Sequence, residues 1–406
     1  MKSLLILINI VLFTTQCFAQ WYTQQSGTNS NLNSVSFTSE SKGHVVGSNV
    51  ILRTDNGGIN WSKTILSGEW NSVSFPTANT GYICGTNGKI LKTTDGGTTW
   101  FNLTSGTQKN LTSINFKNDL NGYVLGWFQT MLVTSDGGAT FANYSGYSSL
   151  MYLHSFIMNN FVFLIGTEGA LFKSTNYGVS FDSINIGMPN SLFAIQFFPN
   201  GKGFVFGCCG AFFKTNDFGQ SWSMDTVYLT KGWALVDCSF ANEHTGWSVG
   251  EQGNIVRTYN SGDNWDSLGS GTNQSLKAVK FVNSTTGWVV GNEGTILKTT
   301  NGGGQGFPIG IYNYSNSIPE KFNLFQNYPN PFNPSTTIEF SLPENSFTQL
   351  KIYDISGKQI ATLVQNELPP GFYRYTFNSS EMNSGTYFYI LTTEKFSESR
   401  KMVVLK

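Results

Sequence analysis

A recurring pattern of hydrophobic and polar positions divides most of the chain into short strands and tight turns. The segment Leu276–Phe281 alternates apolar and polar residues, which predicts a strand with one buried face. Trp288–Gly291 and Thr295–Thr299 follow as two further expected strands, separated by the tight turn Asn292–Gly294. We name these strands a, b and c. A fourth strand, d, is expected to begin at an aromatic residue after the next turn.

The same plan repeats at intervals of about 40 residues. The closing aromatic residues are Trp61, Trp100, Phe141, Phe181, Trp222 and Trp265, at steps of 39, 41, 40, 41 and 43 residues. The expected a strands are Leu32–Phe37, Trp70–Phe75, Leu111–Phe116, Met151–Phe156, Leu192–Phe197, Leu235–Phe240 and Leu276–Phe281. A fixed period of this size in a β-type chain is typical of propeller blades. The sequence therefore predicts an all-β fold with a seven-bladed β-propeller over residues 20–306.

The two ends of the propeller region complement each other. The seventh turn, Thr299–Gly303, has no aromatic residue after it, whereas Trp21–Thr28 aligns with Trp100–Thr107. We therefore expect the N-terminal segment to supply strand d of the seventh blade. This arrangement closes the ring and removes an open sheet edge.

The turn after each strand c resembles the Asp-box, or bacterial neuraminidase repeat, Ser/Thr-x-Asp-x-Gly-x-Thr-Trp. Its acidic position is occupied by Asn56, Asp95, Asp136, Asn176, Asp217, Asn260 and Asn301. Both side chains can accept backbone N–H groups across a turn, and the glycine two residues later supplies a positive φ. Because asparagine replaces aspartate in four repeats, the pattern favours a structural turn and no catalytic residue.

The region from Trp21 to Gly303 also resembles the propellers of the photosystem II assembly-factor type. The motif Gly-Trp-Val-Val-Gly-x-x-Gly-x-Ile-Leu-Lys-Thr at Gly287–Thr299 carries this resemblance. It implies an assembly or binding scaffold. A photosynthetic role is not expected, because the sequence offers no Arg-rich surface.

The chain after residue 306 has a different pattern. Residues 307–317 are expected to form an irregular linker, and residues 318–406 a small immunoglobulin-like β-sandwich. The motifs Tyr328-Pro329-Asn330-Pro331 and Gly385-Thr386-Tyr387, and the last six residues, resemble the type A C-terminal sorting domain of type IX secretion. The resemblance implies the type IX machinery and a sortase as partners of residues 318–406. The product would be secreted or attached to the outer-membrane surface.

The N-terminus and the charge balance support export and exclude several function classes. Residues 1–19 have the pattern of a secretory signal peptide, with a short apolar core and a small-x-Ala cleavage site. Lys plus Arg equals Asp plus Glu, at 24 each, so we expect no nucleic-acid partner. No other segment is apolar and long enough to predict an integral membrane segment.

The cysteines and histidines predict neither a metal nor a cofactor site. Cys84 and Cys238 stand where other repeats carry apolar residues, so both are expected to be buried. Cys208 and Cys209 are adjacent in a turn, and a bridge to Cys238 is left open. His44 takes a position that is aromatic in other repeats, which indicates core packing. The spacing of these residues matches no metal-ligand motif.

Ligand-binding residues are expected in the turns between strands b and c, where propeller ligands usually bind. The candidates are Trp127, Phe128, Glu168, Glu251 and Glu293. Sialidase activity is not expected, because four arginines, two of them in the propeller, cannot supply an arginine triad. The sequence favours a non-catalytic scaffold that binds an unknown protein or glycan. The alternatives are a glycoside hydrolase that uses Glu251 and Glu293, and a surface adhesin.

Overall fold

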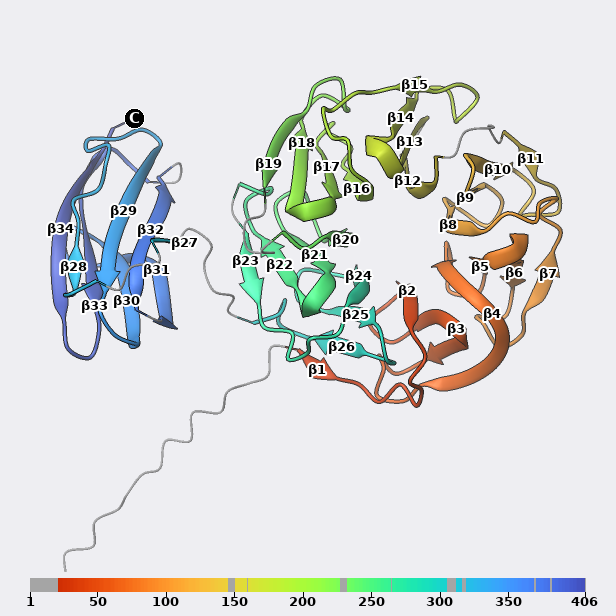
Figure 1. Ribbon diagram of the computed structural model, residues 1–406, viewed down its shortest axis with the longest axis horizontal. Coiled ribbons are helices and arrows are strands. Elements are labelled where there is room, and N and C mark those ends of the chain that lie inside the picture. The colour runs from red at the N-terminus through yellow and green to blue at the C-terminus, as the bar shows by residue number, and fades with distance from the viewer. Residues whose placement is uncertain are drawn as a thin grey trace, which may run out of the picture.

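The computed structural model describes residues 21–144, 150–158, 160–226, 232–263, 265–304, 312–315, 319–368, 370–379 and 382–405. The expected signal peptide, residues 1–19, lies outside the described residues. The described chain forms a ring of β-sheets and a separate two-sheet body (Figure 1). This is the all-β architecture that the repeats predict.

Five sheets of the ring have four strands each. Four of them are β8–β11 (Leu111–Phe116, Gly122–Gly126, Thr130–Thr134, Ala142–Asn143), β12–β15 (Tyr152–Met158, Phe161–Gly166, Leu171–Ser174, Asp182–Ser183), β16–β19 (Leu192–Phe197, Gly203–Gly207, Ala211–Thr215, Ser223–Thr226) and β20–β23 (Leu235–Phe240, Gly246–Gly250, Ile255–Thr258, Asp266–Leu268). The fifth joins β24–β26 (Leu276–Phe281, Gly287–Gly291, Ile296–Thr299) to β1 (Tyr22–Thr23). Within each sheet, successive strands are antiparallel neighbours, as expected for propeller blades.

The first two repeats share one six-stranded sheet. Its strands are β2 (Leu32–Phe37), β3 (Gly43–Thr54), β4 (Ser62–Ser74), β5 (Gly81–Gly85), β6 (Ile90–Thr93) and β7 (Phe101–Leu103). β3 runs through strands b and c of the first repeat, and β4 runs through strand d of the first and strand a of the second. The seven repeats therefore occupy six sheets.

The N-terminal strand closes the ring, as predicted. Tyr22 pairs with Lys298 and Thr23 with Leu297, and the Gln24 N–H donates to the Ile296 carbonyl at 2.8 Å. Trp21 is buried and meets Phe281 edge to face, with ring centroids 5.9 Å apart. The N-terminal segment is thus joined to the last repeat in one sheet.

Stacked rings connect most neighbouring blades. The residue three positions before the glycine of strand b stacks on the phenylalanine at the end of strand a of the next blade, with centroids 3.5 to 4.6 Å apart. The pairs are His44–Phe75, Tyr82–Phe116, Phe163–Phe197, Phe204–Phe240, Trp247–Phe281 and Trp288–Phe37. His44 takes part in the same way as the aromatic residues, which agrees with its expected role in the core. Such stacking adds to the stabilisation from buried area.

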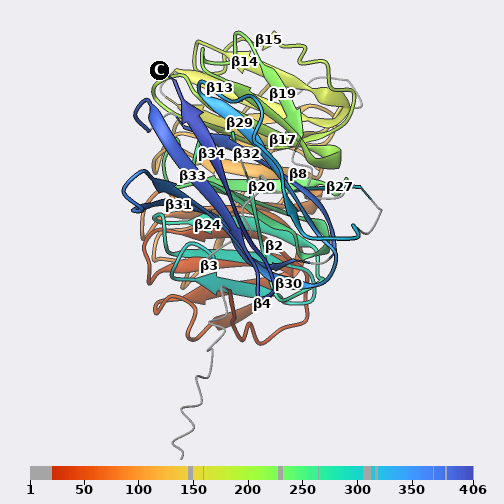
Figure 2. The same ribbon diagram turned by 90° about the vertical axis from the view of Figure 1, so that its left-hand side faces the viewer.

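The C-terminal body consists of two four-stranded sheets that enclose a hydrophobic core; Figure 2 shows its strands in blue as one layered unit. One sheet has the order β27–β32–β29–β28 (Tyr312–Ser315, Gly371–Asn378, Ser335–Leu342, Asn323–Leu324). The other has the order β31–β30–β33–β34 (Gln359–Leu368, Ser346–Asp354, Gly385–Thr392, Ser397–Val404). The two sheets are compatible with the expected immunoglobulin-like sandwich.

The expected linker over residues 307–317 needs a correction. Tyr312–Ser315 form β27 and pair with β32, so this stretch belongs to the sandwich. The alternation Tyr-Asn-Tyr-Ser suits an edge strand, in contrast to the irregular structure expected for it. Residues 307–311 and 316–317 lie outside the described residues.

Candidate functional site

The turns between strands b and c lie on one face of the ring, which we call the b–c face. Four of them form the short helices η1 (Thr86–Gly88), η2 (Thr167–Gly169), η3 (Cys208–Gly210) and η5 (Glu251–Gly253), arranged around the central opening in Figure 1. The middle residue of each turn is exposed and has φ between 53° and 61°. These residues are Asn49, Asn87, Phe128, Glu168, Cys209, Gln252 and Glu293. The structure thus places Phe128, Glu168 and Glu293 at equivalent positions, with Trp127 and Glu251 one residue earlier in their turns.

The third blade differs from its neighbours at the next turn position. Gly88 and Gly253 occupy this position elsewhere, and a Cβ atom at either residue would lie 1.9 Å from a carbonyl oxygen of the following d–a loop. Gln129 stands here in the third blade, with φ 52°, and its N–H donates to the Leu150 carbonyl at 2.8 Å. A side chain at this position prevents the close approach that the glycines allow.

Trp127 and Phe128 form an exposed aromatic pair on the b–c face. Their side chains are 41% and 50% exposed, and their ring centroids lie 6.5 Å apart at 73°. The Lys109 ammonium lies 5.8 Å from the Phe128 ring centroid and donates to the Phe128 carbonyl at 3.3 Å. The Trp127 N–H and carbonyl are both hydrogen-bonded, to Asn110 and Thr130. The aromatic surface is therefore presented by an anchored turn.

The three candidate acids lie in separate turns. Glu251 accepts a hydrogen bond from the Ala234 N–H at 3.2 Å, and Glu293 accepts one from the Gln274 amide at 2.8 Å. Glu168 is exposed. Glu293 also lines a groove of about 420 Å³ beside the N-terminal segment Thr23–Asn29. Glu251 and Glu293 thus each hold a neighbouring segment of their own blade, which is ordinary turn chemistry.

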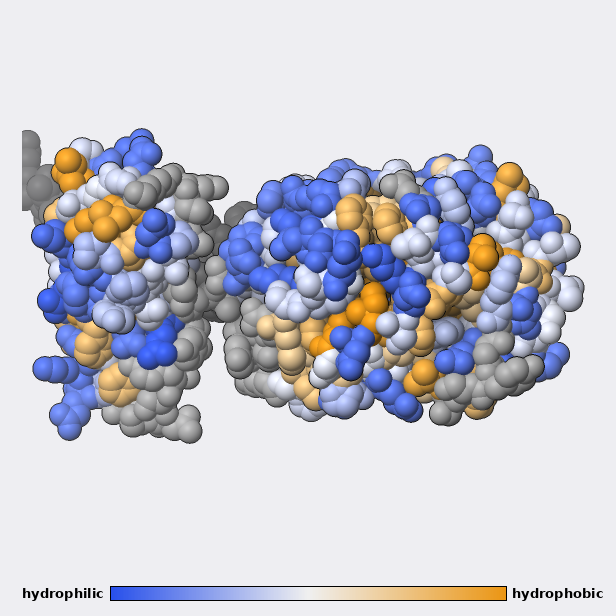
Figure 3. All heavy atoms as spheres, turned by 90° about the horizontal axis from the view of Figure 1, so that it is seen from above, coloured by the Kyte–Doolittle hydropathy of each residue, from blue (hydrophilic) through white to orange (hydrophobic). Residues whose placement is uncertain are grey.

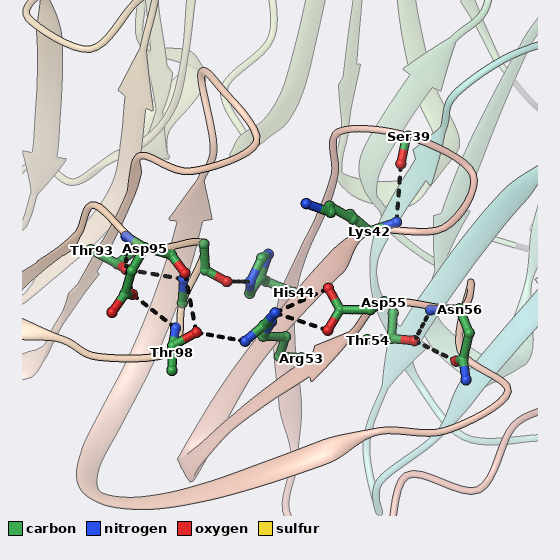
Figure 4. A network of polar contacts seen from close by, with 12 residues as sticks. Ser39, Lys42, His44, Arg53, Thr54, Asp55, Asn56, Thr93, Asp95 and Thr98 are labelled. Atoms are coloured by element: carbon green, nitrogen blue, oxygen red, sulfur yellow. Dashed lines mark hydrogen bonds and ion pairs between the residues drawn. The ribbon is translucent and has the colours of Figure 1, made fainter.

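The Asp-boxes form closed hydrogen-bonded turns on the opposite face. The Asp95 carboxylate accepts bonds from the Thr98 and Thr99 N–H groups and the Thr93 and Thr99 hydroxyls, at 2.6 to 3.0 Å. Figure 4 shows Asp95 with Thr93 and Thr98. The Thr99 hydroxyl contributes most to holding the pKa of Asp95 at about 2. In the first blade, the Asn56 side chain accepts from the Asn60 N–H at 2.9 Å. Aspartate and asparagine therefore support the same turn.

Basic residues just before the boxes tie adjacent boxes together. The Arg53 guanidinium donates to the Thr98 hydroxyl of the next box at 2.7 Å and forms an ion pair with Asp55 of its own box at 2.9 Å (Figure 4). Arg257 donates to the carbonyls of Gly302 and Gly304 and pairs with Asp266. Both propeller arginines are thus engaged in contacts between or within blades.

His44 lies beside the second box. Its Nε2 is 3.0 Å from the Gly96 carbonyl oxygen, so this nitrogen carries the proton. Burial lowers the pKa of His44 to about 4, and the ring is neutral at pH 7. A Cβ atom at Gly97, which has φ 79°, would lie 2.6 Å from the same nitrogen. The second glycine of this box is therefore required by both backbone conformation and space.

The a strands line a central cavity of about 420 Å³ whose polar residues the sequence analysis did not single out. The Ser34 and Ser72 hydroxyls each accept an N–H from the next blade at 3.2 Å. Asp237 takes the same strand position in the sixth blade and accepts the Val279 N–H at 2.8 Å. Burial raises the pKa of Asp237 to about 7, and it lowers the pKa of the neighbouring Lys280. An acid where the a strands of the first three repeats carry serine, at Ser34, Ser72 and Ser113, is the signal that would have identified this residue.

The side of the molecule seen in Figure 3 is mostly hydrophilic, with small hydrophobic patches. Among the described residues, no group of three or more His, Cys, Asp or Glu side chains is placed to hold a metal ion. Among the same residues, no helix has the length and apolar content needed to cross a membrane.

Comparison with known proteins identifies both parts of the chain. The family model described as "Photosynthesis system II assembly factor YCF48" matches residues 14–108, 66–145 and 211–300, which together make up more than half of the chain. The model described as "Secretion system C-terminal sorting domain" matches residues 326–405. A search of curated proteins finds no significant match.

Solved structures support the propeller fold. A structure described as "YCF48 bound to D1 peptide" is 19% identical, with a TM-score of 0.60, over 70% of this chain and 97% of that one. YCF48 from Cyanidioschyzon merolae is 18% identical, with a TM-score of 0.59, over 69% and 98%. The WD40 propeller domain of Doa1 is 13% identical, with a TM-score of 0.54, over 70% and 97%. The chain belongs to the YCF48-like family of BNR-repeat propellers and carries a C-terminal sorting domain of the type IX secretion system, which directs it to the cell surface or beyond.

Proposed function

We propose that the exported propeller binds a segment of another protein on its b–c face and does not catalyse a reaction there. The observation that carries this proposal is the exposed pair Trp127 and Phe128, anchored by its turn and flanked by the Lys109 ammonium. A few residues carry most of the binding energy in protein interfaces, and tryptophan is enriched among them. A YCF48 structure that contains a bound peptide supports a protein segment as the ligand class.

The acids Glu168, Glu251 and Glu293 complete the proposed binding face. They lie in the b–c turns of three different blades and add negative charge to a face that also carries the Lys109 ammonium. Charges of both signs around an aromatic anchor favour a polar, specific ligand over a purely apolar one. We propose the seven box residues as structural elements that keep the opposite face closed.

The sorting domain sets where this binding takes place. We propose that the type IX machinery recognises the C-terminal sandwich and that a sortase removes it, which leaves the propeller released or attached to the outer-membrane surface. We place the propeller at residues 20–306. Because β27 belongs to the sandwich, we place the start of the sorting unit at Tyr312 and not at residue 318.

The binding proposal is tested with the full chain and a displayed library of random peptides. Enriched peptides are titrated against the wild type, Trp127→Ala and Phe128→Ala. Each substitution should weaken binding at least about tenfold, which corresponds to about 1.4 kcal/mol. Tyr177→Ala is the matched control, because Tyr177 is 64% exposed in a box turn on the opposite face. If no peptide is enriched, or if Tyr177→Ala weakens binding as much as the b–c variants, the proposal fails.

The hydrolase alternative is tested separately with a panel of polysaccharides. The proposal predicts no release of reducing ends by the wild type. Turnover that Glu251→Gln or Glu293→Gln abolishes would establish the glycoside hydrolase and overturn the non-catalytic role. Binding of a glycan from the panel without turnover, and no binding of peptides, would instead support the adhesin alternative.

A further inference from the structure

Two adjacent cysteines occupy the b–c turn of the fifth blade. Cys208 and Cys209 lie in η3, and their Sγ atoms are 2.8 Å apart. Cys209 is exposed and Cys208 partly so, whereas Cys84 is fully buried. The equivalent turn positions carry the pairs Thr86-Asn87, Thr167-Glu168, Glu251-Gln252 and Asn292-Glu293. In the third blade the equivalent pair is Trp127-Phe128, so the turn accepts varied side chains and gives no packing reason for two sulfur atoms.

The geometry brings the two sulfur atoms within reach of a bond. A disulfide has an S–S length of about 2.05 Å, so bond formation requires the two atoms to approach by less than about 1 Å. The left-handed conformation of Cys209, with φ 61°, folds the chain back at this point. The Cα atoms of adjacent residues are about 3.8 Å apart, closer than in most disulfides, and a strained bridge of this kind is readily reduced.

We propose that Cys208 and Cys209 form a reversible vicinal disulfide in the exported protein. Exported bacterial proteins meet oxidising conditions, in which disulfides form and persist. The proposal concerns a modification site and does not depend on the proposed ligand of the b–c face.

The oxidant is a second disulfide, of a small thiol or of a thiol oxidoreductase. The exposed Cys209 sulfur attacks this disulfide as the thiolate, forms a mixed disulfide and releases one thiol. The Cys208 sulfur then attacks the Cys209 sulfur, loses its proton and releases the second thiol. Overall, the two cysteines lose two hydrogen atoms, and the oxidant is reduced to two thiols.

The surroundings of Cys208 fit this order of events. The hydrogen bond with Cys209, followed by burial and the negative charge of Glu251, raises the pKa of Cys208 to about 11. Cys208 is thus protonated at neutral pH, and Cys209 is the sulfur that an external disulfide reaches first. The bridge would fix the turn beside Glu251, which lies on the neighbouring blade.

Peptide mapping of the full chain tests the proposal. Trypsin releases Gly203–Lys214, which contains Cys208 and Cys209, and it separates this peptide from Cys84 and Cys238. After incubation with oxidised glutathione and alkylation in denaturant, the peptide should carry no label and be about two mass units lighter than its reduced form. After native treatment with dithiothreitol, it should carry two labels.

Two variants make the outcome specific. Cys238→Ala should leave the unlabelled peptide unchanged, whereas Cys208→Ser should give a mixed disulfide of Cys209 with glutathione. Two labels on Gly203–Lys214 after oxidation, or a cross-link from this peptide to the one that contains Cys238, would overturn the proposal. A bridge that dithiothreitol reduces only in denaturant would refute its reversibility.

Discussion

Ring closure by the N-terminal segment predicts that Trp21 stabilises the whole propeller. Trp21 is 5% exposed and packs in a cluster with Trp247, Leu268, Phe281 and Leu297. It immediately precedes the two paired residues of β1, so it anchors a strand with very few hydrogen bonds of its own. Replacing Trp21 with alanine should loosen this strand and expose the edge of β26.

The expected loss of unfolding free energy follows from the burial of Trp21. Replacing a buried tryptophan with alanine costs about 3–5 kcal/mol in unfolding free energy. The Trp21 indole N–H has no hydrogen-bond partner among the described residues, and its removal relieves that penalty. We therefore expect the lower end of the range, about 3 kcal/mol, and a fall in Tm of about 6 °C.

Differential scanning calorimetry of the full chain measures this effect on the propeller transition. Tyr22→Ala is the matched control, because Tyr22 is the next residue in β1 and its side chain is 41% exposed. It should lower Tm by less than about 2 °C, since exposed substitutions change stability little. A Trp21→Ala protein that unfolds within about 1 °C of the wild type would refute the closure argument.

Three further predictions concern acids and export. Hydrogen bonds hold the pKa values of the box aspartates below the usual 3.8. The stability that these groups add is therefore present above about pH 4 and is lost as the pH falls towards 2. Between pH 5 and pH 2.5, the Tm of a triple variant with Asp95→Asn, Asp136→Asn and Asp217→Asn should fall less than the Tm of the wild type. Asp237 should change stability with pH in the opposite direction. Burial raises its pKa to about 7, so the free energy of unfolding falls as the pH rises from about 4 to 7. Asp237→Ser should therefore raise Tm relative to the wild type more at pH 8 than at pH 4. An equal change in Tm at both pH values would contradict that direction. A chain that lacks residues 312–406 should accumulate in the periplasm of a host with type IX secretion, as measured by cell fractionation, and normal surface display would contradict the role of the sorting domain.

The sequence predicted the ring closely because each blade repeats the same local chemistry. Strand a matches its predicted bounds in five repeats, from Leu32–Phe37 to Leu276–Phe281, since apolar and polar residues alternate there under one buried face. In the fourth repeat the strand is Tyr152–Met158, shifted from the expected Met151–Phe156. The closing strand was found because Trp21–Thr28 preserves the pattern of strand d.

Other features were not readable from the repeat pattern. β4 joins the first two repeats in one sheet, and Ser48 of β3 pairs with Glu69 of β4. The pattern within a single repeat does not contain this pairing. Asp237 stands out in the repeat pattern as an acid in a serine position, but its burial beside the central cavity and its bond to the next blade depend on the assembled ring. β27 was missed because a four-residue edge strand carries too little pattern to be distinguished from a linker. The b–c turns hold candidate ligand groups at fixed backbone positions, but turn sequences carry no signal for the ligand.

Hydrogen exchange of the full chain, with and without a peptide selected from the displayed library, tests the central claim most directly. The account predicts that the peptide slows exchange in the turns at residues 127–129, 168, 251 and 293, and leaves the box turns around Asp95, Asp136 and Asp217 unchanged. Slower exchange confined to the box turns would contradict the assignment of the b–c face as the binding surface.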